Sequence, residues 1–287
     1  MAALTIKSAE EIELVRQASR IVSDVLALLR DQVVEGTTTT AMDRLAEEFI
    51  RDQGAEPAFK GYIVQGEVYP STLCTSVNSA VVHGLPDDRP LAQGDLLSID
   101  VGVRLAGYYG DSAATYPVGE VSDEARRLMQ ATEDALWLGI AQAVDGNRVY
   151  DISRAVQRHV EANGFSIVRE LVGHGIGKRL HEEPSIPNFL PSPFARHQFR
   201  NAQLIDGMTI CIEPMVNAGT YRVATLEDRW TVVTADGRLS AHYEHTVVIR
   251  PGRAEVLTSW PSPNGRDLAD AGGTIEKIYG QADSDQS

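Results

Sequence analysis

The sequence predicts an α+β protein made of two similarly built halves. Helical periodicity followed by strand-like text occurs once in residues 5–119 and again in residues 120–250. The two stretches do not align residue by residue, yet the order of their elements is the same. We therefore expect one pseudo-symmetric domain over residues 1–250, followed by a loosely held tail at residues 251–287.

Helical patterns occur in four segments. Ser8 and Glu11 match a capping box at the start of a helix expected over residues 8–33, whose apolar positions recur at helical spacing. A threonine cluster at residues 37–40 starts a second helix, which Gly54 ends. Two further helices are expected over residues 122–144 and 149–162. Strand-like text, rich in Thr, Val, Tyr and Ile, follows each pair of helices.

Composition narrows the class of protein. Hydrophobic residues make up 43% and charged residues 23%, as in an ordinary globular chain. Asp and Glu number 40 against 26 Lys and Arg, and the net charge of −14 disfavours nucleic acid and anionic membranes as partners. No apolar run approaches the roughly 20 residues of a membrane span, and the start MAALTIKSAEE does not resemble a signal peptide. The expected location is the cytoplasm.

The two cysteines, Cys74 and Cys211, show no CxxC spacing. They predict neither a disulfide framework nor a thiolate zinc site. Any metal ion would then depend on carboxylates and histidines.

The most informative segment is the strand pair in residues 96–119. Asp100 lies opposite an apolar strand face, and a turn at Leu105 and Ala106 would place it directly across from Asp111. Opposed side chains lie about 5 Å apart, where two like charges need compensation such as a divalent cation. Leu-Ala is poor turn chemistry, so a loop over residues 104–107 with another register stays open, as do two solvated aspartates.

Other polar residues interrupt apolar or glycine-rich segments. Glu213 in TICIEPMV and Glu244 in HYEHTVVI place a carboxylate in an apolar strand, where burial without a partner is costly. Each therefore needs a cation, a hydrogen-bond network or a solvent-exposed strand face. His174 lies among glycines in VGHGIGKRLHEEP, followed by His181, and His83 precedes a turn. For each glutamate alone, an ordinary half-exposed strand is the favoured alternative, and for each histidine alone, a hydrogen-bonded structural role is at least as well supported as a functional one.

Together these residues form a candidate ligand set with a charge of −4, consisting of Asp100, Asp111, His174, Glu213 and Glu244. Two divalent cations would neutralise that charge, and mostly oxygen donors favour Mn, Fe or Co. Such a site lowers the pKa of a bridging water and polarises a carbonyl, which is hydrolase chemistry. The sequence completes no phosphate-loop, HExxH or GxSxG motif.

Five segments in order resemble the methionine aminopeptidase family over about residues 5–250: SVNSAVVHG, SIDVGV with GYYGDSA, GHGIGKRLHEEP, IEPMV and HYEHTVVI. The short span between His181 and Glu213 resembles the type I, bacterial-like enzymes. The resemblance implies the pita-bread fold of creatinases and aminopeptidases, in which two αβ halves enclose a dinuclear metal centre. It also implies a cytoplasmic monomer that acts on peptides or nascent polypeptides, with contact to the ribosome left open.

The resemblance implies a role for each site residue. The ligands of two divalent ions, drawn from Mn, Fe, Co and Zn, would be Asp100, Asp111, His174, Glu213 and Glu244. Glu213 would also be the general base for a metal-bridged hydroxide that removes an N-terminal methionine before a small second residue. His83 would contact the scissile amide, and His181 the substrate carbonyl or the tetrahedral intermediate. The residues matching the methionine side-chain pocket are Tyr62, Tyr69, Cys74 and Trp230.

Local departures from the family concern the pocket: longer loops near residues 61–70 and 188–203, and Leu180 where an aromatic residue is common.

Two alternative functions remain. A proline-specific aminopeptidase or dipeptidase of the same fold normally has an extra N-terminal domain, for which we expect no room before Ser8. A non-catalytic binding module would be expected to have lost ligands, whereas every ligand position is filled.

Overall fold

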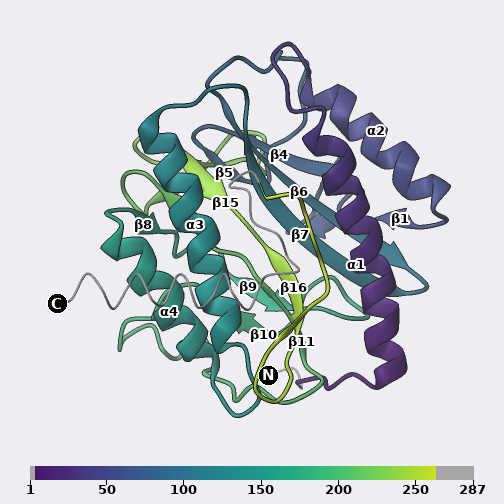
Figure 1. Ribbon diagram of the computed structural model, residues 1–287, viewed down its shortest axis with the longest axis vertical. Coiled ribbons are helices and arrows are strands. Elements are labelled where there is room, and N and C mark those ends of the chain that lie inside the picture. The colour runs from purple at the N-terminus through teal and green to yellow at the C-terminus, as the bar shows by residue number, and fades with distance from the viewer. Residues whose placement is uncertain (1–3, 263–287) are drawn as a thin grey trace.

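The computed structural model describes residues 4–262, in which two pairs of helices flank a set of β-strands (Figure 1). The helices are α1 (Ala9–Arg30), α2 (Thr39–Asp52), α3 (Asp123–Gln142) and α4 (Val149–Ala162). Each of them lies within a few residues of the segment that the sequence predicted. The α+β class is therefore confirmed, with one helix pair preceding the strands of each half.

Side chains at the helix starts account for these bounds. Ser8 Oγ accepts a hydrogen bond from the Glu11 N–H at 3.3 Å, and Glu11 Oε2 accepts one from the Ser8 N–H at 3.0 Å, as the predicted capping box requires. Thr38 and Ser122 accept hydrogen bonds from backbone N–H groups in the first turns of α2 and α3. Three helices thus begin where a local side chain satisfies their free N–H groups.

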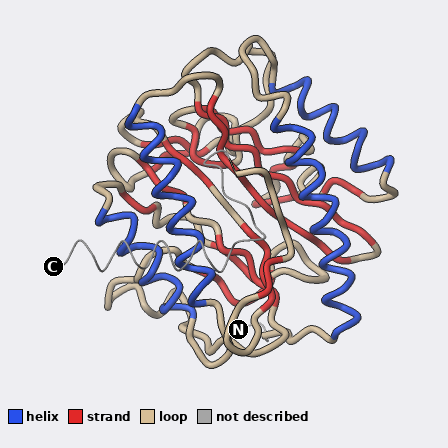
Figure 2. The backbone as a smooth tube through the Cα atoms, viewed as in Figure 1, coloured by secondary structure: helices blue, strands red, loops and turns tan. Residues whose placement is uncertain are grey.

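Within residues 4–262 the strands form five sheets, which lie between the helix pairs (Figure 2). One has the order β1-β6-β4, with β7 also paired to β6, and a second has the order β10-β9-β11-β16-β17. The smaller sheets are β15-β12-β8, β13-β14-β5 and β2-β3. The strands of the first half are β1 (Glu56–Pro57), β2 (Ile63–Val64), β3 (Glu67–Val68), β4 (Leu73–Val77), β5 (Ala80–Val82), β6 (Leu96–Leu105) and β7 (Tyr108–Pro117). Those that follow α4 are β8 (Ser166–Ile167), β9 (Gly173–Gly175), β10 (Glu182–Ile186), β11 (Thr209–Ile212), β12 (Met215–Asn217), β13 (Val223–Thr225), β14 (Val232–Thr234), β15 (Ser240–His242), β16 (His245–Val248) and β17 (Glu255–Val256).

The helices bury their apolar faces on these strands. α1 packs on β6 and β7, and α3 packs on α4 and on β11, β12 and β15. α1 lies close to β7 at Gly110, where an added Cβ would lie 2.6 Å from the Ser19 nitrogen, so a side chain there would push the helix off the sheet. One buried apolar cluster runs through both halves and includes Val22, Leu97 and Leu136. The halves therefore share a core.

The β6–β7 hairpin has a different register from the predicted one. Asp100 pairs with Ala113 instead of Asp111, because the two-residue turn is formed by Ala106 and Gly107. Both turn residues have positive φ, 50° and 84°, as a type I′ turn requires and as glycine tolerates best. Side chains alternate with a period of two, so this shift of two residues keeps both aspartates on one face, as diagonal neighbours.

The prediction of a loose tail is wrong for residues 251–262. β17 pairs with β16, and Trp260 is 5% exposed, with its ring stacked on His245 at a centroid distance of 4.7 Å. Leu257 is also buried. The neighbours of these two buried residues in the sequence are mostly small polar residues and prolines. The composition of the segment therefore predicted a loose tail. The remainder of the predicted tail, residues 263–287, lies outside the described residues.

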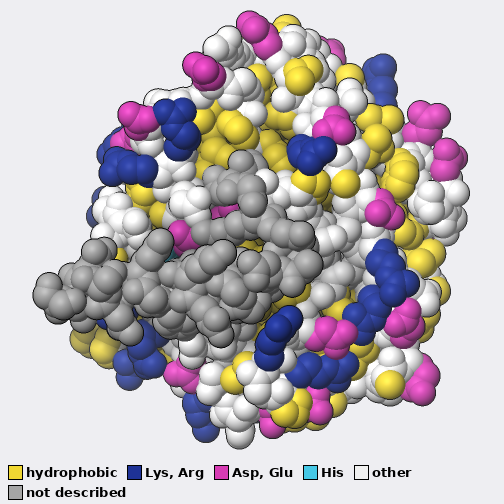
Figure 3. All heavy atoms as spheres, viewed as in Figure 1, with side chains coloured by type: hydrophobic (Ala, Val, Ile, Leu, Met, Phe, Trp, Pro, Cys, Tyr) yellow, Lys and Arg dark blue, Asp and Glu magenta, His cyan; other side chains and the backbone are white. Residues whose placement is uncertain are grey.

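The surface carries both signs of charge. On the face shown in Figure 3, Lys and Arg side chains are interspersed with Asp and Glu. Ion pairs near the surface include those of Arg16 and Arg250 with Glu255. Ion pairs at a protein surface contribute little to stability.

No helix within residues 4–262 combines the length and the apolar character that crossing a membrane would demand.

Candidate metal centre

One cavity collects all the residues that the sequence singled out. It has a volume of about 130 Å³ and takes residues from both halves of the chain. The predicted residues lining it are Tyr62, Tyr69, Cys74, His83, Asp100, Asp111, His174, His181, Glu213, Trp230 and Glu244. Phe59, Val64 and Leu180 complete the wall. Segments as far apart as residues 59 and 244 therefore contribute to a single site.

Hydrogen bonds between the two halves bring the acidic residues together. Glu244 directly precedes β16, and its N–H donates to the Ala113 carbonyl of β7 at 2.8 Å. The Thr246 hydroxyl donates to the Asp111 carbonyl at 2.7 Å, and the Ser112 hydroxyl donates to the Glu244 carbonyl at 2.5 Å. These bonds hold the backbone of Glu244 beside that of Asp111 independently of their carboxylates.

Three carboxylates form the acidic centre. Oxygens of Asp100, Asp111 and Glu244 lie within 4.8 Å of one another, and each residue has one buried oxygen without a hydrogen-bond partner in residues 4–262. Burial raises the pKa of Asp100 to about 7. Burial, reinforced by neighbouring carboxylates, raises the pKa values of Asp111 and Glu244 well above their ordinary range. A divalent cation fits this donor set, because it would give the orphaned oxygens a partner and offset their repulsion.

His174 presents a nitrogen lone pair to these carboxylates. Its Nδ1 lies 2.9 Å from the Gly175 carbonyl, which can only accept, so Nδ1 carries the proton and Nε2 does not. Nε2 lies 3.6 Å from Glu213 Oε1 and 3.9 Å from Asp111 Oδ2. Burial, with a smaller effect of His181, lowers the pKa of His174 to about 3. A neutral imidazole oriented by a backbone carbonyl has the arrangement typical of a metal ligand.

Glu213 lies beside this histidine, with Oε1 3.6 Å from His174 Nε2, and within the electrostatic influence of the aspartates. Burial raises its pKa well above the ordinary range, and the charges of Asp100 and Asp111 raise it further. The carboxylate is therefore a better proton acceptor than an exposed glutamate would be.

His83 occupies a strained position in the cavity wall. Its φ of 58° lies in the left-handed region, which costs a non-glycine residue about 1–3 kcal/mol. The next residue, Gly84, lies so close to β4 that a Cβ would be 2.2 Å from the Thr75 carbonyl oxygen. Burial, with a smaller effect of His181, lowers the pKa of His83 to about 4. The strand contact thus holds a neutral imidazole at the cavity.

His181 and Tyr62 form a hydrogen-bonded pair at the rim. The Tyr62 hydroxyl lies 2.7 Å from His181 Nδ1, and the His181 ring lies edge-on to that of His174 at a centroid distance of 4.3 Å. Burial lowers the pKa of His181 and raises that of Tyr62, so both are neutral near pH 7. When the phenol donates to Nδ1, the ring proton is on Nε2, which can then donate to a bound group.

Aromatic side chains and a thiol form the apolar part of the cavity. The Tyr69 hydroxyl donates to the carbonyls of Leu73 and Gly84, both at 2.9 Å, which orients its ring edge-on to Trp230. Cys74 is buried in the same cluster. The longer loop near residues 61–70 forms the β2–β3 hairpin, and an Arg229–Glu67 ion pair ties this hairpin to the segment carrying Trp230.

Sequence reasoning missed two residues of this centre. Cys211 Sγ lies within 4.8 Å of ligand atoms of His174 and Glu244. His242 Nε2 lies 3.8 Å from Glu213 Oε2, and burial lowers the pKa of His242 to about 3. Each precedes a predicted glutamate by two positions, and side chains two apart on a strand share a face. Strand alternation was therefore the signal that could have found both.

Comparisons with known proteins identify the family. Residues 13–251 match metallopeptidase family M24. The methionine aminopeptidase of Clostridium perfringens is 50% identical over 255 residues, which cover 89% of this chain and 98% of that protein. Methionine aminopeptidase 1 of Bacillus subtilis is 45% identical over 252 residues, with coverages of 88% and 98%.

Solved structures show the same fold. A crystal structure of methionine aminopeptidase from Thermotoga maritima matches with a TM-score of 0.84 and 40% identity, over 90% of this chain and all of that one. A prolidase from Pyrococcus furiosus matches with a TM-score of 0.70 over 88% of this chain and 65% of that one, but at 23% identity it shows the fold alone. The predicted pita-bread fold is confirmed. The chain belongs to metallopeptidase family M24, on the methionine aminopeptidase branch of that family.

Proposed function

We propose that this protein removes the N-terminal methionine from peptides and nascent polypeptides whose second residue is small. The observation that carries the proposal is a single cavity in which three carboxylates, each with one buried oxygen that has no hydrogen-bond partner in residues 4–262, adjoin a recess lined by aromatic rings and a thiol. The names of the relatives at 45% and 50% identity support the same activity. The proposal extends to a cytoplasmic monomer, as the family resemblance implies.

Two divalent ions would be held by the predicted set, Asp100, Asp111, His174, Glu213 and Glu244. Four carboxylates and a neutral imidazole carry a charge that two such ions offset, and Mn, Fe, Co and Zn all accept these donors. When bound, the ions lower the pKa of water and polarise a carbonyl. The short distances among Asp100, Asp111 and Glu244 support a shared site for them.

Glu213 would be the general base. Its two carboxylate oxygens lie 3.6 and 3.8 Å from the rings of His174 and His242, whose lowered pKa values keep both rings neutral near pH 7. A raised pKa lets the carboxylate take a proton from the attacking water and return it to the leaving amine.

Two histidines of the cavity, His83 and His181, would bind the peptide bond. His83, held at the cavity wall by its strained backbone, would contact the scissile amide. His181 would donate from Nε2 to the substrate carbonyl oxygen, with Tyr62 on its other nitrogen. Loss of a comparable donor in other hydrolases costs about 2.7–4 kcal/mol of transition-state stabilisation.

The methionine side chain would lie in the aromatic recess. Tyr69 and Trp230 offer ring edges and faces to a thioether, and contacts of that kind contribute about 0.3–1.5 kcal/mol each. Cys74 adds a polarisable sulfur to the same wall.

The test is a peptide assay on metal-free protein supplied with Mn²⁺ or Co²⁺. Peptides beginning Met-Ala, Met-Lys and Xaa-Pro are compared in parallel. We expect methionine release from Met-Ala, far less from Met-Lys and none from Xaa-Pro, and we expect a chelator to abolish it. Asp111→Asn should lose this activity, whereas Asp88→Asn, a control in an exposed loop, should keep it.

Each alternative has its own outcome in this assay. Cleavage confined to Xaa-Pro would identify a proline-specific enzyme. Metal binding without cleavage of any peptide would identify a binding module. Full turnover by chelator-treated, metal-free protein would contradict the metal mechanism.

A further inference from the structure

Cys211 lies in the middle of the sheet that carries the second half of the centre. β11 runs between β9 and β16, and its registers place Cys211 across from His174 on one side and from Thr246 on the other. Glu213 directly follows β11 and Glu244 directly precedes β16, so both proposed ligands lie at the ends of the two strands that Cys211 and Thr246 join. The strand pairing therefore directs this thiol into the acidic centre.

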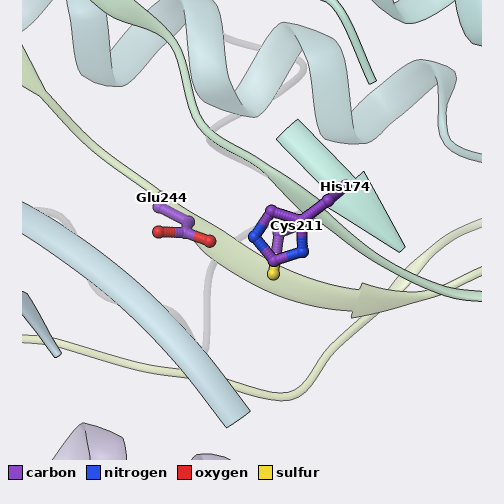
Figure 4. Close-up of side chains that lie close together, drawn as sticks. All are labelled: His174, Cys211 and Glu244. Carbon is purple, nitrogen blue, oxygen red and sulfur yellow. The ribbon is translucent and has the colours of Figure 1, made fainter. Parts of the chain in front are cut away.

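The thiol is in contact with a proposed metal ligand. Cys211 is fully buried, its Sγ lies 3.4 Å from the hydroxyl oxygen of Thr246, and the thiol also hydrogen-bonds to the Glu244 carboxylate. Its Sγ, a ring nitrogen of His174 and a carboxylate oxygen of Glu244 lie within 4.8 Å of one another (Figure 4). Glu244 Oε1 has no hydrogen-bond partner in residues 4–262. The three carboxylates that support the oxygen-rich site also lie within 4.8 Å of one another.

Thiolate, imidazole and carboxylate are the donors that zinc takes in proteins. Zinc bonds of about 2.3 Å to sulfur and 2.0–2.1 Å to nitrogen put two ligands of one tetrahedral ion roughly 3.5 Å apart. The trio would then need to close by roughly 1.3 Å at most, which side-chain rotation can supply.

We propose that Cys211 is a metal ligand, which with His174 and Glu244 forms a thiolate site for a thiophilic divalent ion such as Zn²⁺. Binding replaces the S–H bond by a metal–sulfur bond, and the proton leaves to solvent. The site shares His174 and Glu244 with the five-residue set, so a thiophilic ion bound here excludes the arrangement in which both serve a pair of oxygen-bound ions. The softness of the available ion selects between the two arrangements.

Cys74 provides a matched control. It is the other cysteine of the chain, it is buried, and it lines the same cavity. It lies on the aromatic side of the cavity beside Tyr69, and the groups of metal donors found in residues 4–262 do not include it.

The experiment is a Cd²⁺ titration of the metal-free full-length protein, followed by the ultraviolet absorption of the cadmium–thiolate bond. Wild type and Cys74→Ser should develop this absorption, and Cys211→Ser should not. The Cd²⁺ affinity of Cys211→Ser should fall by about 10-fold or more, since loss of even an outer-sphere partner typically costs that much. Its Mn²⁺ affinity should change by a smaller factor. Cys211→Thr, whose hydroxyl can still donate to Glu244, should behave like Cys211→Ser, and circular dichroism checks the fold of each variant.

Absence of the absorption in wild type at saturating Cd²⁺ would overturn the inference. So would its loss in Cys74→Ser together with its retention in Cys211→Ser. The inference goes beyond the proposed function, and the two fail separately. Methionine release with Mn²⁺ and no cadmium–thiolate absorption overturns only the thiolate site. The absorption without methionine release at any metal overturns only the proposed activity.

Discussion

In metal-free protein, Asp100→Asn should increase stability at neutral pH even though it removes a proposed metal ligand. The Asp100 carboxylate lies within 4.8 Å of those of Asp111 and Glu244, and its Oδ1 has no hydrogen-bond partner in the described part of the chain. Without a cation, ionising this group costs free energy. The substitution removes the charge and keeps the approximate shape of the side chain.

The magnitude follows from the raised pKa. Burial raises the pKa of Asp100 from 3.8 to about 7, so between these pH values the folded protein holds a proton that the unfolded chain has released. The free energy of unfolding therefore falls by about 1.4 kcal/mol for each pH unit as pH rises through this window. Over the whole window the loss is on the order of 4 kcal/mol for this one group. The amide of asparagine does not titrate, so this pH-dependent loss of stability is absent from the Asp100→Asn variant. The free energy of unfolding of the variant should therefore rise relative to that of wild type as the pH rises through this window.

Urea unfolding at pH 5, 6, 7 and 8 in the presence of a chelator measures this difference. Asp88→Asn, in an exposed loop, should give a profile parallel to wild type. Added Mn²⁺ should stabilise wild type, by about 2.7 kcal/mol at 100 times its Kd, and stabilise Asp100→Asn much less. Parallel profiles for wild type and Asp100→Asn, or a less stable variant at pH 8, would refute the reasoning.

Three further outcomes are expected. Glu213→Gln should lower kcat on a Met-Ala peptide by about 10²–10⁴-fold while the melting temperature stays close to that of wild type; near-normal turnover in a metal-loaded sample would exclude Glu213 as the base. Tyr62→Phe removes the 2.7 Å hydrogen bond to His181 and should lower kcat/KM by about 2- to 12-fold, with no further loss in a His181→Ala background. Gly110→Val drives a side chain into α1 at Ser19 and should destabilise the fold by about 1–3 kcal/mol or more in urea unfolding, and unchanged stability would show that α1 can shift freely.

The predictions from local patterns agree best with the structure. Ser8, Thr38 and Ser122 mark helix starts because each side chain bonds N–H groups within the next turn. Asp100 and Asp111 share a face despite the wrong register, since an error of two residues preserves the face of a strand. An error of one residue would have separated them. All predicted site residues line one cavity, while their roles in binding and catalysis stay predictions.

The failures concern contacts between distant segments. Residues 251–262 are rich in small polar residues and prolines, which predicted a loose tail. In the structure the ring of Trp260 stacks on that of His245. Nothing within a few residues of Cys211 indicates that His174 lies across the sheet from it, because their neighbourhood depends on how β9 pairs with β11. Without CxxC spacing the thiol predicted no metal site, yet the sheet places it beside two candidate ligands.

The sequence by itself determined the helices, the alternation of the strands and the family, because capping, periodicity and motif order are properties of neighbouring residues. Only the tertiary structure decided which side chains share the cavity and in what register. Glu244 lies beside Asp111 because hydrogen bonds join β16 of one half to β7 of the other, across more than a hundred residues of chain. Cross-strand pairing is set by the packing of both halves on one core, which no local pattern encodes.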